Sequence, residues 1–309
     1  MMWRHERKTI PFVVILFLCV SLVHPLSTIS PPLREQAKKV VVSGDWADAK
    51  AKLRKPECCV VTISNLDDHL EVLQNHFVNS GPADLDLRAK INLKSSTRQD
   101  CLQIRRSVID IPGDDYEENC ILVNDPCTDA LEELARGIGS LADGPLEGVC
   151  EDVFMRIVCA SNYKAIDPMY HTDKAPLRGY VTLCGVGTEF MTRTCSPIEY
   201  VMLRGFGEGK LGQSVRQAEE LEFIVMKGDH YIANDIESVN SNAAHLITKL
   251  WKRAIACVHR SPPAAASGGR RVIISLDLAD GEDDREWYQA DTKREWRSGM
   301  TQRKSRLVA

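Results

Sequence analysis

The sequence predicts an α+β protein whose second half is rich in strands and whose first half supplies flanking helices and a supporting α/β region. Three observations lead to this fold class. Short apolar runs with many β-branched residues recur between Phe154 and Leu276, at the length of buried strands. Apolar residues spaced three and four apart, which indicate amphipathic helices, occur mainly before residue 150. A hydrophobic content of 44% and a charged content of 27% are ordinary for a globular protein.

The length of 309 residues allows about two domains, or one domain with additions, and leaves ample chain for a core. A net charge of -4 and a pI near 6.1 give no overall electrostatic footprint for nucleic acid, so no nucleic-acid partner is expected. We expect a signal peptide or targeting segment at 1–30, a linker at 31–57, the N-terminal α/β support region at 58–150, the strand-rich region with the candidate site at 151–279, and a charged tail at 280–309.

The first residues have the pattern of a signal peptide. Arg4, Arg7 and Lys8 form a basic segment, and an apolar run follows from Ile10 to Val23. The run is shorter than the ~20 apolar residues of a membrane-spanning helix, so no stable membrane span is expected. This pattern predicts entry into the secretory pathway, with the endoplasmic reticulum lumen or the cell exterior as destination. Organelle import and a signal-anchored membrane protein are the alternatives.

The chain has 11 cysteines, and Cys19 lies inside the apolar run, so signal cleavage would leave an even number. An even number is compatible with disulfides in an oxidising compartment and equally with buried reduced thiols. No Cys-x-x-Cys pair occurs, which argues against a zinc ribbon or a thioredoxin-type redox site.

In the first half, apolar spacing and turn residues define the predicted elements. The helix after the first strand would have Leu66, Leu70, Leu73 and Phe77 on one face. We expect a helix at 46–53, a strand at 58–63, a helix capped by Ser64 or Asn65, two short strands between residues 85 and 111, and a helix at 129–141.

In the second half, strands dominate the prediction. Alternation in the strand at 180–184 could send Tyr180 and Thr182 into the interior. We expect further strands at 154–160, 254–258 and 272–276, a mobile glycine-rich loop at 205–212, a helical insertion at 240–253, and an exposed helix or partly disordered extension after residue 280.

The candidate site begins at His171-Thr172-Asp173. In an extended segment, side chains two residues apart project to the same face, so His171 and Asp173 could bind one metal ion. His259, which follows a predicted strand, is the best-placed third ligand. Two imidazoles and one carboxylate form the facial triad of non-haem Fe(II) oxygenases, which leaves positions open for substrate and dioxygen. His230 competes for the third position, but we expect it beside the pocket rather than on the metal.

Further motifs follow the His-x-Asp segment in order. Gly187-Thr188-Glu189-Phe190 comes next, Met226-Lys227-Gly228-Asp229 comes later, and Arg270 and Arg271 open the strand after His259. This order resembles the Fe(II)/2-oxoglutarate-dependent dioxygenases. The resemblance implies a double-stranded β-helix core, also called a jelly roll or cupin-like fold, with Fe(II) and 2-oxoglutarate as cofactors. It also implies that Arg271 or Arg270 binds the distal carboxylate of 2-oxoglutarate.

The two arginines lie on opposite faces of the predicted strand. Alternation places Arg271 on the face of Ser275 and Arg270 on the other. The first face resembles a half-polar pocket, so Arg271 is favoured as the anchor. In the alternative, both arginines are solvated or pair with Asp277 and Glu189. If exposed, such ion pairs would contribute little to stability.

A closer resemblance is to the family known as domain of unknown function 1826, and it covers roughly residues 159 to 278. That family has no settled activity, so the resemblance supports the fold and the metal more than a substrate. It rests on Tyr170-His171-Thr172-Asp173, Leu177-Arg178, Gly185-Val186-Gly187-Thr188-Glu189, Lys227-Gly228-Asp229 and Val258-His259-Arg260-Ser261-Pro262.

These resemblances imply an oxidoreductase that uses Fe(II), 2-oxoglutarate and dioxygen to hydroxylate or demethylate a substrate that the sequence does not identify. Three alternatives stay open. The protein could be a jelly roll that binds a metal or ligand without catalysis, or a cupin-type metalloenzyme that does not use 2-oxoglutarate. It could also be an extracellular, disulfide-bonded interaction domain in which His171 and His259 lie far apart.

Overall fold

The computed structural model describes residues 41–108, 125–142, 150–163, 168–206, 214–231, 256–262 and 269–278. All of them belong to one structural unit, Lys39–Ala309. The predicted targeting segment, most of the predicted loop at 205–212, the predicted helix at 240–253 and the charged tail lie outside the described residues.

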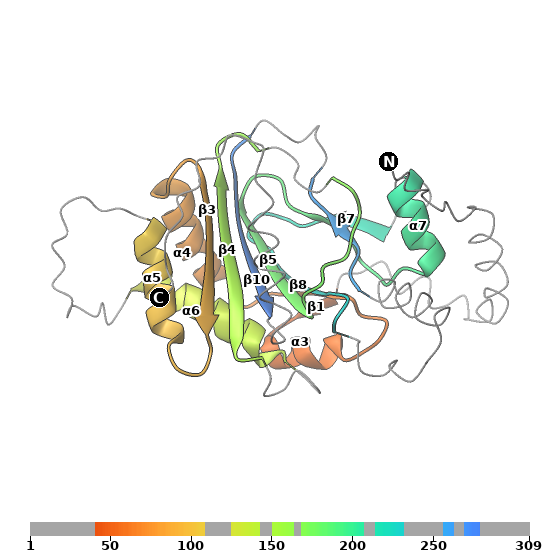
Figure 1. The fold of residues 1–309 in the computed structure, drawn as a ribbon, viewed down its shortest axis with the longest axis horizontal. Coiled ribbons are helices and arrows are strands. Elements are labelled where there is room, and N and C mark those ends of the chain that lie inside the picture. Colours follow the sequence, from red (N-terminus) through yellow and green to blue (C-terminus); the bar gives the residue numbers. More distant parts are fainter. Residues whose placement is uncertain are drawn as a thin grey trace, which may run out of the picture. The chain divides into compact units, whose positions relative to one another are not determined.

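A seven-stranded sheet forms the main layer of the fold, in the order β1-β2-β8-β5-β10-β4-β3 (Figure 1). β1 and β2 are parallel, and the other neighbouring strands are antiparallel. Strands from the first half of the chain thus lie at both ends of the sheet that carries the candidate site. The strands are β1 (Val41–Ser43), β2 (Val60–Ile63), β3 (Leu85–Asn92), β4 (Asp152–Ala160), β5 (Leu177–Cys184), β8 (Phe223–Lys227) and β10 (Arg271–Leu278).

A second, three-stranded sheet has the order β7-β6-β9. It consists of β6 (Glu189–Met191), β7 (Val215–Gln217) and β9 (His259–Arg260). His171 joins this small sheet through an isolated bridge to His259. An apolar cluster connects the two sheets, with Tyr180 and Ile273 from the large sheet and Phe190 from the small one.

From β4 onward, the chain passes repeatedly from one sheet to the other. It passes from β4 in the large sheet to His171 in the small one, returns to β5, and continues to β6 and β7 in the small sheet. β8, β9 and β10 then belong to the large, the small and the large sheet. As a result, the last strand, β10, lies between β4 and β5. This interleaving of eight segments over two sheets is that of a double-stranded β-helix, so the predicted jelly-roll core is confirmed.

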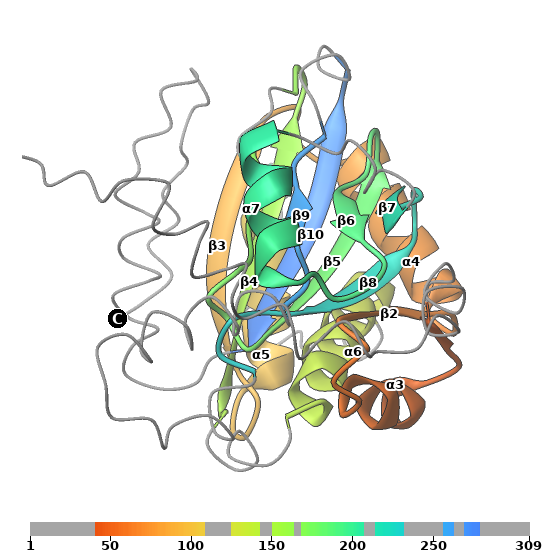
Figure 2. The same cartoon turned by 90° about the vertical axis from the view of Figure 1, so that its right-hand side faces the viewer.

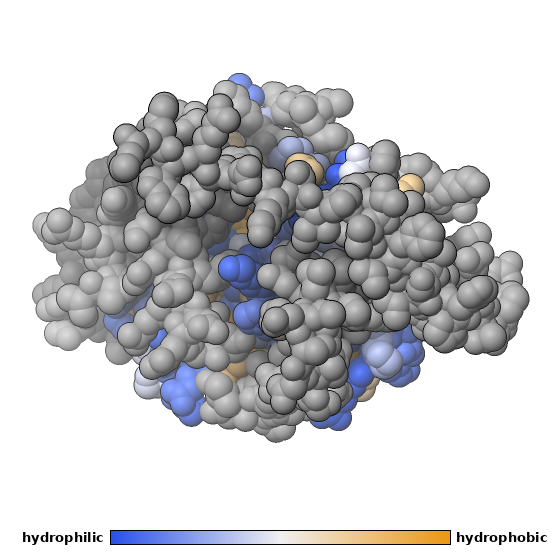
Figure 3. All heavy atoms as spheres, turned by 45° about the vertical axis from the view of Figure 1, so that its right-hand side comes forward, coloured by the Kyte–Doolittle hydropathy of each residue, from blue (hydrophilic) through white to orange (hydrophobic). Residues whose placement is uncertain are grey.

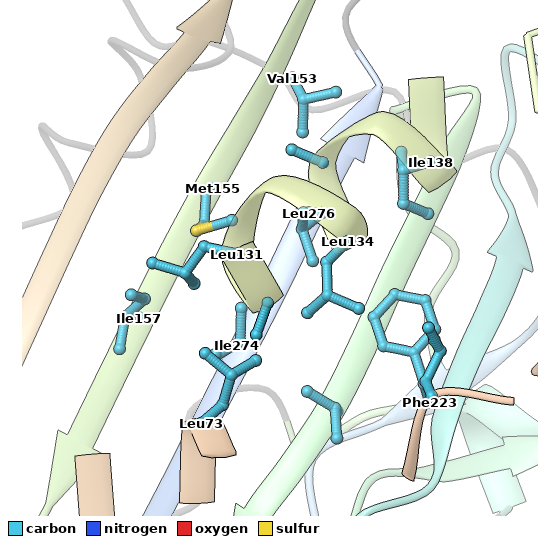
Figure 4. Close-up of a cluster of buried hydrophobic side chains, with 14 of the residues drawn as sticks. Leu73, Leu131, Leu134, Ile138, Val153, Met155, Ile157, Phe223, Ile274 and Leu276 are labelled. Atoms are coloured by element: carbon cyan, nitrogen blue, oxygen red, sulfur yellow. The ribbon is translucent and has the colours of Figure 1, made fainter. Parts of the chain in front are cut away.

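Helices cover the face of the large sheet that points away from the small sheet (Figures 1 and 2). Apolar residues of α6, among them Leu131, Leu134 and Ile138, lie over Met155 and Leu276 of the sheet (Figure 4). The helices of this layer are α3 (Trp46–Leu53), α4 (Asp67–Gln74) with its π-helical continuation η1 (Asn75–Asn79), α5 (Thr97–Val108) and α6 (Pro126–Ser140).

Helix α7 (Pro197–Phe206) lies against the small sheet instead (Figure 2). Its Tyr200 and Leu203 are buried in one cluster with Met191 and Val258. On the face shown in Figure 3, the described residues that reach the surface are mainly hydrophilic. Of the helices that the structure describes, none has both the length and the apolar character needed to cross a bilayer.

Several predicted elements are confirmed. The helix at Trp46–Leu53 has the predicted bounds, and the strands predicted at 154–160, 180–184 and 272–276 correspond to β4, β5 and β10. The apolar face predicted for α4 and η1 is buried, since Leu70, Leu73 and Phe77 are at most 1% exposed. The predicted side-chain cap is wrong, because Leu66 occupies the N-cap position and makes no such hydrogen bond.

The second strand predicted between residues 85 and 111 is wrong. Among residues 85–108, the part of this range that the structure describes, only β3 is a strand, and Thr97–Val108 forms helix α5. The buried residues Thr97, Cys101, Ile104 and Val108 recur three and four positions apart among polar neighbours, so a helix can bury them on one side and a strand cannot.

Two helix and strand boundaries also differ from the prediction. Helix α6 begins at Pro126 rather than at residue 129, because the Asp125 side chain caps it by accepting from the backbone N–H of Thr128 at 3.1 Å. The strand predicted at 254–258 is absent from residues 256–258, and β9 begins at His259. Isolated backbone hydrogen bonds hold this segment instead of a strand ladder. For example, the N–H of Cys257 donates to the carbonyl of Lys227 at 2.8 Å.

Candidate metal centre

His171 and His259 lie next to each other on the small sheet. The backbone N–H of each residue donates to the carbonyl oxygen of the other, at 2.9 Å in both directions. This is the hydrogen-bonded pair of an antiparallel ladder, in which the two side chains project to the same face. The centroids of the two imidazole rings are 4.5 Å apart. This distance contradicts the alternative in which the two histidines lie far apart.

Asp173 reaches the same point from the loop that leads to β5. The turn after β8 supports this loop, because the N–H of Asp229 donates to the carbonyl of Asp173 at 2.8 Å. Gly228 packs so closely that an added Cβ would lie 1.8 Å from the Ala175 carbonyl oxygen. The Lys-Gly-Asp motif therefore lies at the end of β8 and holds the loop of Asp173 in place.

One ligand atom from each of His171, Asp173 and His259 lies within 4.8 Å of the others. In the part of the chain that the structure describes, this is the one group of three or more histidine, cysteine or acidic side chains with that proximity. His230 is not a member of it. The three residues selected from the sequence are therefore brought together, and the competing histidine is not.

Both imidazoles are oriented by the backbone. Nδ1 of His171 lies 2.9 Å from the Met169 carbonyl oxygen, and Nδ1 of His259 lies 3.2 Å from the Cys257 carbonyl oxygen. A carbonyl oxygen can only accept, so each Nδ1 carries a proton. The lone pair of each neutral ring is then on Nε2, which is how metal-binding histidines are usually held.

The Asp173 carboxylate has one oxygen engaged and one directed at the histidines. Oδ1 accepts from Arg178 at 2.7 Å. Oδ2 is buried, has no hydrogen-bond partner among the residues that the structure describes, and lies 3.1 Å from Nε2 of His259. Two ligand atoms bound at right angles to one ion at about 2.1 Å would be about 3 Å apart. The spacing of His259 and Asp173 and the donor set of the three residues therefore fit a divalent transition metal.

The charges of this cluster favour a cation at Nε2 of His259. Burial raises the pKa of Asp173, but the positive charges of Arg178 and His259 outweigh it and hold that pKa well below its usual range. Burial lowers the pKa of His259, but the negative charge of Asp173 outweighs it, so that pKa is raised. A metal ion would take the place of the proton that this carboxylate attracts.

Arg178 connects Asp173 to the large sheet. It donates from Nε and Nη2 to the two carboxylate oxygens of Asp277, at 2.5 and 2.8 Å, and from Nη1 to Asp173. Arg178, which belongs to one of the motifs of the DUF1826 resemblance, is therefore a salt-bridge residue in the structure. Asp277 was expected only as a partner of Arg270 or Arg271. Its role follows from strand register, which the sequence does not show.

Arg271 points into the space between the sheets and is 3% exposed. Its Nη2 donates to the hydroxyl of Tyr180 at 2.7 Å and to that of Thr188 at 3.3 Å. The Tyr163 ring lies 4.5 Å from the guanidinium carbon. Within the described part of the chain, its buried Nε has no hydrogen-bond partner and no carboxylate pairs with it. A buried cation without a counter-ion is costly, so this position favours an anionic ligand.

Arg270 lies on the opposite side of β10. Its Nη2 donates to the backbone carbonyl of Phe77 in the helical layer, at 3.4 Å. The alternative in which both arginines pair with Asp277 and Glu189 is wrong, because Asp277 binds Arg178 and Glu189 binds Arg260 at 2.6 Å. Thr188 was not singled out as a contact of the arginine, although it lies in a motif that the sequence had marked.

The nine cysteines of the described part of the chain are all free thiols. Most are buried, and burial raises the pKa of Cys101 and Cys127 to about 12. For these residues, the structure agrees with the second of the two possibilities that the sequence left open, buried reduced thiols acting as small apolar side chains.

Solved structures with a similar arrangement include two plant enzymes described as dioxygenases for auxin oxidation. The rice enzyme is 13% identical, with a TM-score of 0.42, and the match covers 80% of this chain and 85% of the other. The Arabidopsis thaliana enzyme, in a 2-oxoglutarate binary complex, is 11% identical, with a TM-score of 0.43 and coverage of 79% and 94%.

A third similar structure is that of a full-length Neurospora crassa protein in complex with alpha-KG and 5-formyluracil. It is 12% identical, with a TM-score of 0.36 and coverage of 76% of this chain and 79% of that one. No curated protein matches the chain.

A family model gives the assignment at the level of sequence. The model described as protein of unknown function (DUF1826) matches residues 118–277, which is more than half of the 309 residues. The match includes the three residues of the candidate metal centre and both arginines. The chain therefore belongs to the DUF1826 family.

Proposed function

We propose that this protein is an Fe(II)- and 2-oxoglutarate-dependent oxygenase. The observation that carries the proposal is a buried arginine, Arg271, that has no acidic partner among the described residues and lies between the two sheets whose residues assemble two imidazoles and a carboxylate. A metal site alone would be compatible with a cupin-type metalloenzyme or with a jelly roll that does not catalyse. The buried guanidinium of Arg271 favours an anionic cosubstrate, and neither alternative requires one.

In this proposal, His171, Asp173 and His259 hold Fe(II) through Nε2, Oδ2 and Nε2. Bound there with 2-oxoglutarate and dioxygen, the iron would supply the oxidising chemistry that no protein side chain offers. The backbone carbonyls of Met169 and Cys257 keep both rings in the tautomer that binds a metal. The three protein ligands leave positions open for the cosubstrate.

Arg271 is the proposed anchor for the distal carboxylate of 2-oxoglutarate, and Arg270 is not. The guanidinium of Arg271 offers a planar fork that matches a carboxylate. The hydroxyls of Tyr180 and Thr188 hold the fork at one edge, and the Tyr163 ring limits its movement from one face. Because the group is almost fully buried, the interaction with an anion would be little screened by water.

The proposal predicts different effects for the two arginines. In Mn(II)-loaded protein, Arg271→Met should weaken 2-oxoglutarate binding by about 30-fold to 1000-fold, as expected for losing one partner of a buried charge pair. Arg270→Met, the matched control on the opposite face, should change the affinity by less than about threefold. Isothermal titration of 2-oxoglutarate into each variant measures both effects.

Equal affinities in the Arg271 and Arg270 variants would contradict the assignment of the anchor. Binding of Mn(II) without any binding of 2-oxoglutarate to the wild-type protein would instead support the cupin-type or non-catalytic alternative.

A further inference from the structure

We propose that Arg178 and Asp277 form a tether that positions Asp173 as a metal ligand and restricts it to a single coordinating oxygen. The inference rests on the metal site of the proposed function and adds two positioning residues to it. Neither residue would contact the metal. Both would act through the carboxylate of Asp173.

The tether begins as a cross-strand pair in the large sheet. Arg178 on β5 and Asp277 on β10 lie directly opposite each other in the antiparallel register. Their contact is a bidentate fork with distances of 2.5 and 2.8 Å, and their side chains are only 19% and 9% exposed. Such a fork fixes the plane of the guanidinium. The remaining donor, Nη1, is thereby fixed in direction as well.

That remaining donor reaches Asp173. Nη1 of Arg178 lies 2.7 Å from Oδ1, and the Asp173 side chain is 10% exposed. The two histidines are held by the small sheet, whereas Asp173 is not in a strand. Arg178, which belongs to the large sheet, therefore holds the carboxylate of Asp173, while the small sheet holds the two imidazole rings. The ligand set is assembled where the two sheets face each other.

The tether also determines which oxygen of Asp173 is available. Oδ1 is held by Arg178, whereas Oδ2 accepts no hydrogen bond from the described part of the chain and lies 3.1 Å from Nε2 of His259. Binding through Oδ2 alone uses one coordination position. A carboxylate that bound through both oxygens would take a second position, which the facial triad leaves open for other ligands.

Asp277 has an electrostatic part in addition to its geometric one. Arg178 beside Asp173 would by itself reduce the negative charge that the site presents to a cation. Asp277 neutralises Arg178, so the three groups together keep the single negative charge of Asp173. If the Arg178–Asp277 pair only joined the two strands, removing the charge of Asp277 would not change the affinity of the site for a metal ion.

The test is the affinity of the purified full chain for Co(II) in Arg178→Lys and Asp277→Asn. Lysine keeps the charge but lacks the planar fork that holds the two carboxylates in a fixed geometry, and asparagine keeps the shape but removes the compensating charge. We expect the dissociation constant to rise about 10-fold to 100-fold in each, the usual effect of losing a group that orients a metal ligand. The Co(II) absorption spectrum of Arg178→Lys should change as the second oxygen becomes free to bind.

Arg156→Lys is the matched control. Arg156 on β4 makes a comparable fork, at 2.8 and 3.0 Å, with Asp86 on β3, and β4 is two strands away from β5 in the same sheet. Its Co(II) affinity should stay within about twofold of the wild type, and thermal unfolding of all three variants without metal reports any loss of stability.

The outcomes separate the two proposals. Absence of Co(II) binding to the wild-type protein would overturn the metal site itself. Wild-type binding with unchanged affinity and spectrum in Arg178→Lys and Asp277→Asn would overturn the tether alone. An equal loss of affinity in Arg156→Lys would also overturn it, because any broken fork in the sheet would then have the same effect. If Arg178→Lys does not fold, Asp277→Asn decides.

Discussion

Replacement of His259 by alanine should weaken metal binding by about two hundredfold or more. A metal site of three protein ligands with a total binding free energy of ~10 kcal/mol loses roughly a third of it, about 3 kcal/mol, with one ligand. Nε2 of His259 also lies 3.1 Å from Oδ2 of Asp173, a spacing that two ligands of one ion would have. Titration with Mn(II), followed by the electron paramagnetic resonance signal of the free ion, measures the affinity directly.

Thermal unfolding gives an independent check of this expectation. A ligand that binds only the folded state raises the melting temperature, so Mn(II) should raise that of the wild-type protein but not that of His259→Ala. His230→Ala is the matched control, because His230 is not in the three-residue group. An Mn(II)-dependent shift that survives in His259→Ala and disappears in His230→Ala would mean that the metal binds elsewhere.

Gly228→Ala should both destabilise the protein and weaken the metal site. The new Cβ would lie 1.8 Å from the carbonyl oxygen of Ala175 and 2.8 Å from that of Asp173. Both are backbone atoms, so no flexible side chain can move aside, and the loop that carries Asp173 must shift. Overpacking of this kind costs about 1–3 kcal/mol, and we expect the upper end of that range. Urea unfolding of the metal-free protein measures the loss.

Gly44→Ala is the control for the glycine substitution, since nothing lies within 4 Å of a Cβ at that position. Its midpoint of unfolding should match the wild type, and its Mn(II) affinity should be unchanged. A Gly228→Ala variant with wild-type stability and wild-type Mn(II) affinity would show that the turn after β8 does not hold the Asp173 loop.

The candidate site could be predicted from the sequence where its geometry is local or follows from alternation. His171 and Asp173 lie two residues apart in one extended segment, and Arg271 differs from Arg270 by the face of a strand. The third ligand, His259, was selected because of the ordered motifs around it, and the structure places it beside His171. These predictions needed no knowledge of which strands pair.

The contacts that sequence reasoning missed all depend on strand pairing. Asp277 meets Arg178 because β10 lies beside β5, and a shift of one residue in that register would point Asp277 to the other face. Thr188 meets Arg271 only because the two sheets face each other. The incorrect strand prediction at Thr97–Val108 has a different cause, because there the helical spacing of buried residues was already present in the sequence.

The central claim is that one site binds both Fe(II) and 2-oxoglutarate, and an anaerobic titration of the full chain with both tests it most directly. We expect a weak visible charge-transfer band that saturates at one equivalent of each ligand and is lost in His171→Ala. Fe(II) binding without the band would contradict the assignment of 2-oxoglutarate, and the absence of Fe(II) binding would contradict the metal centre itself.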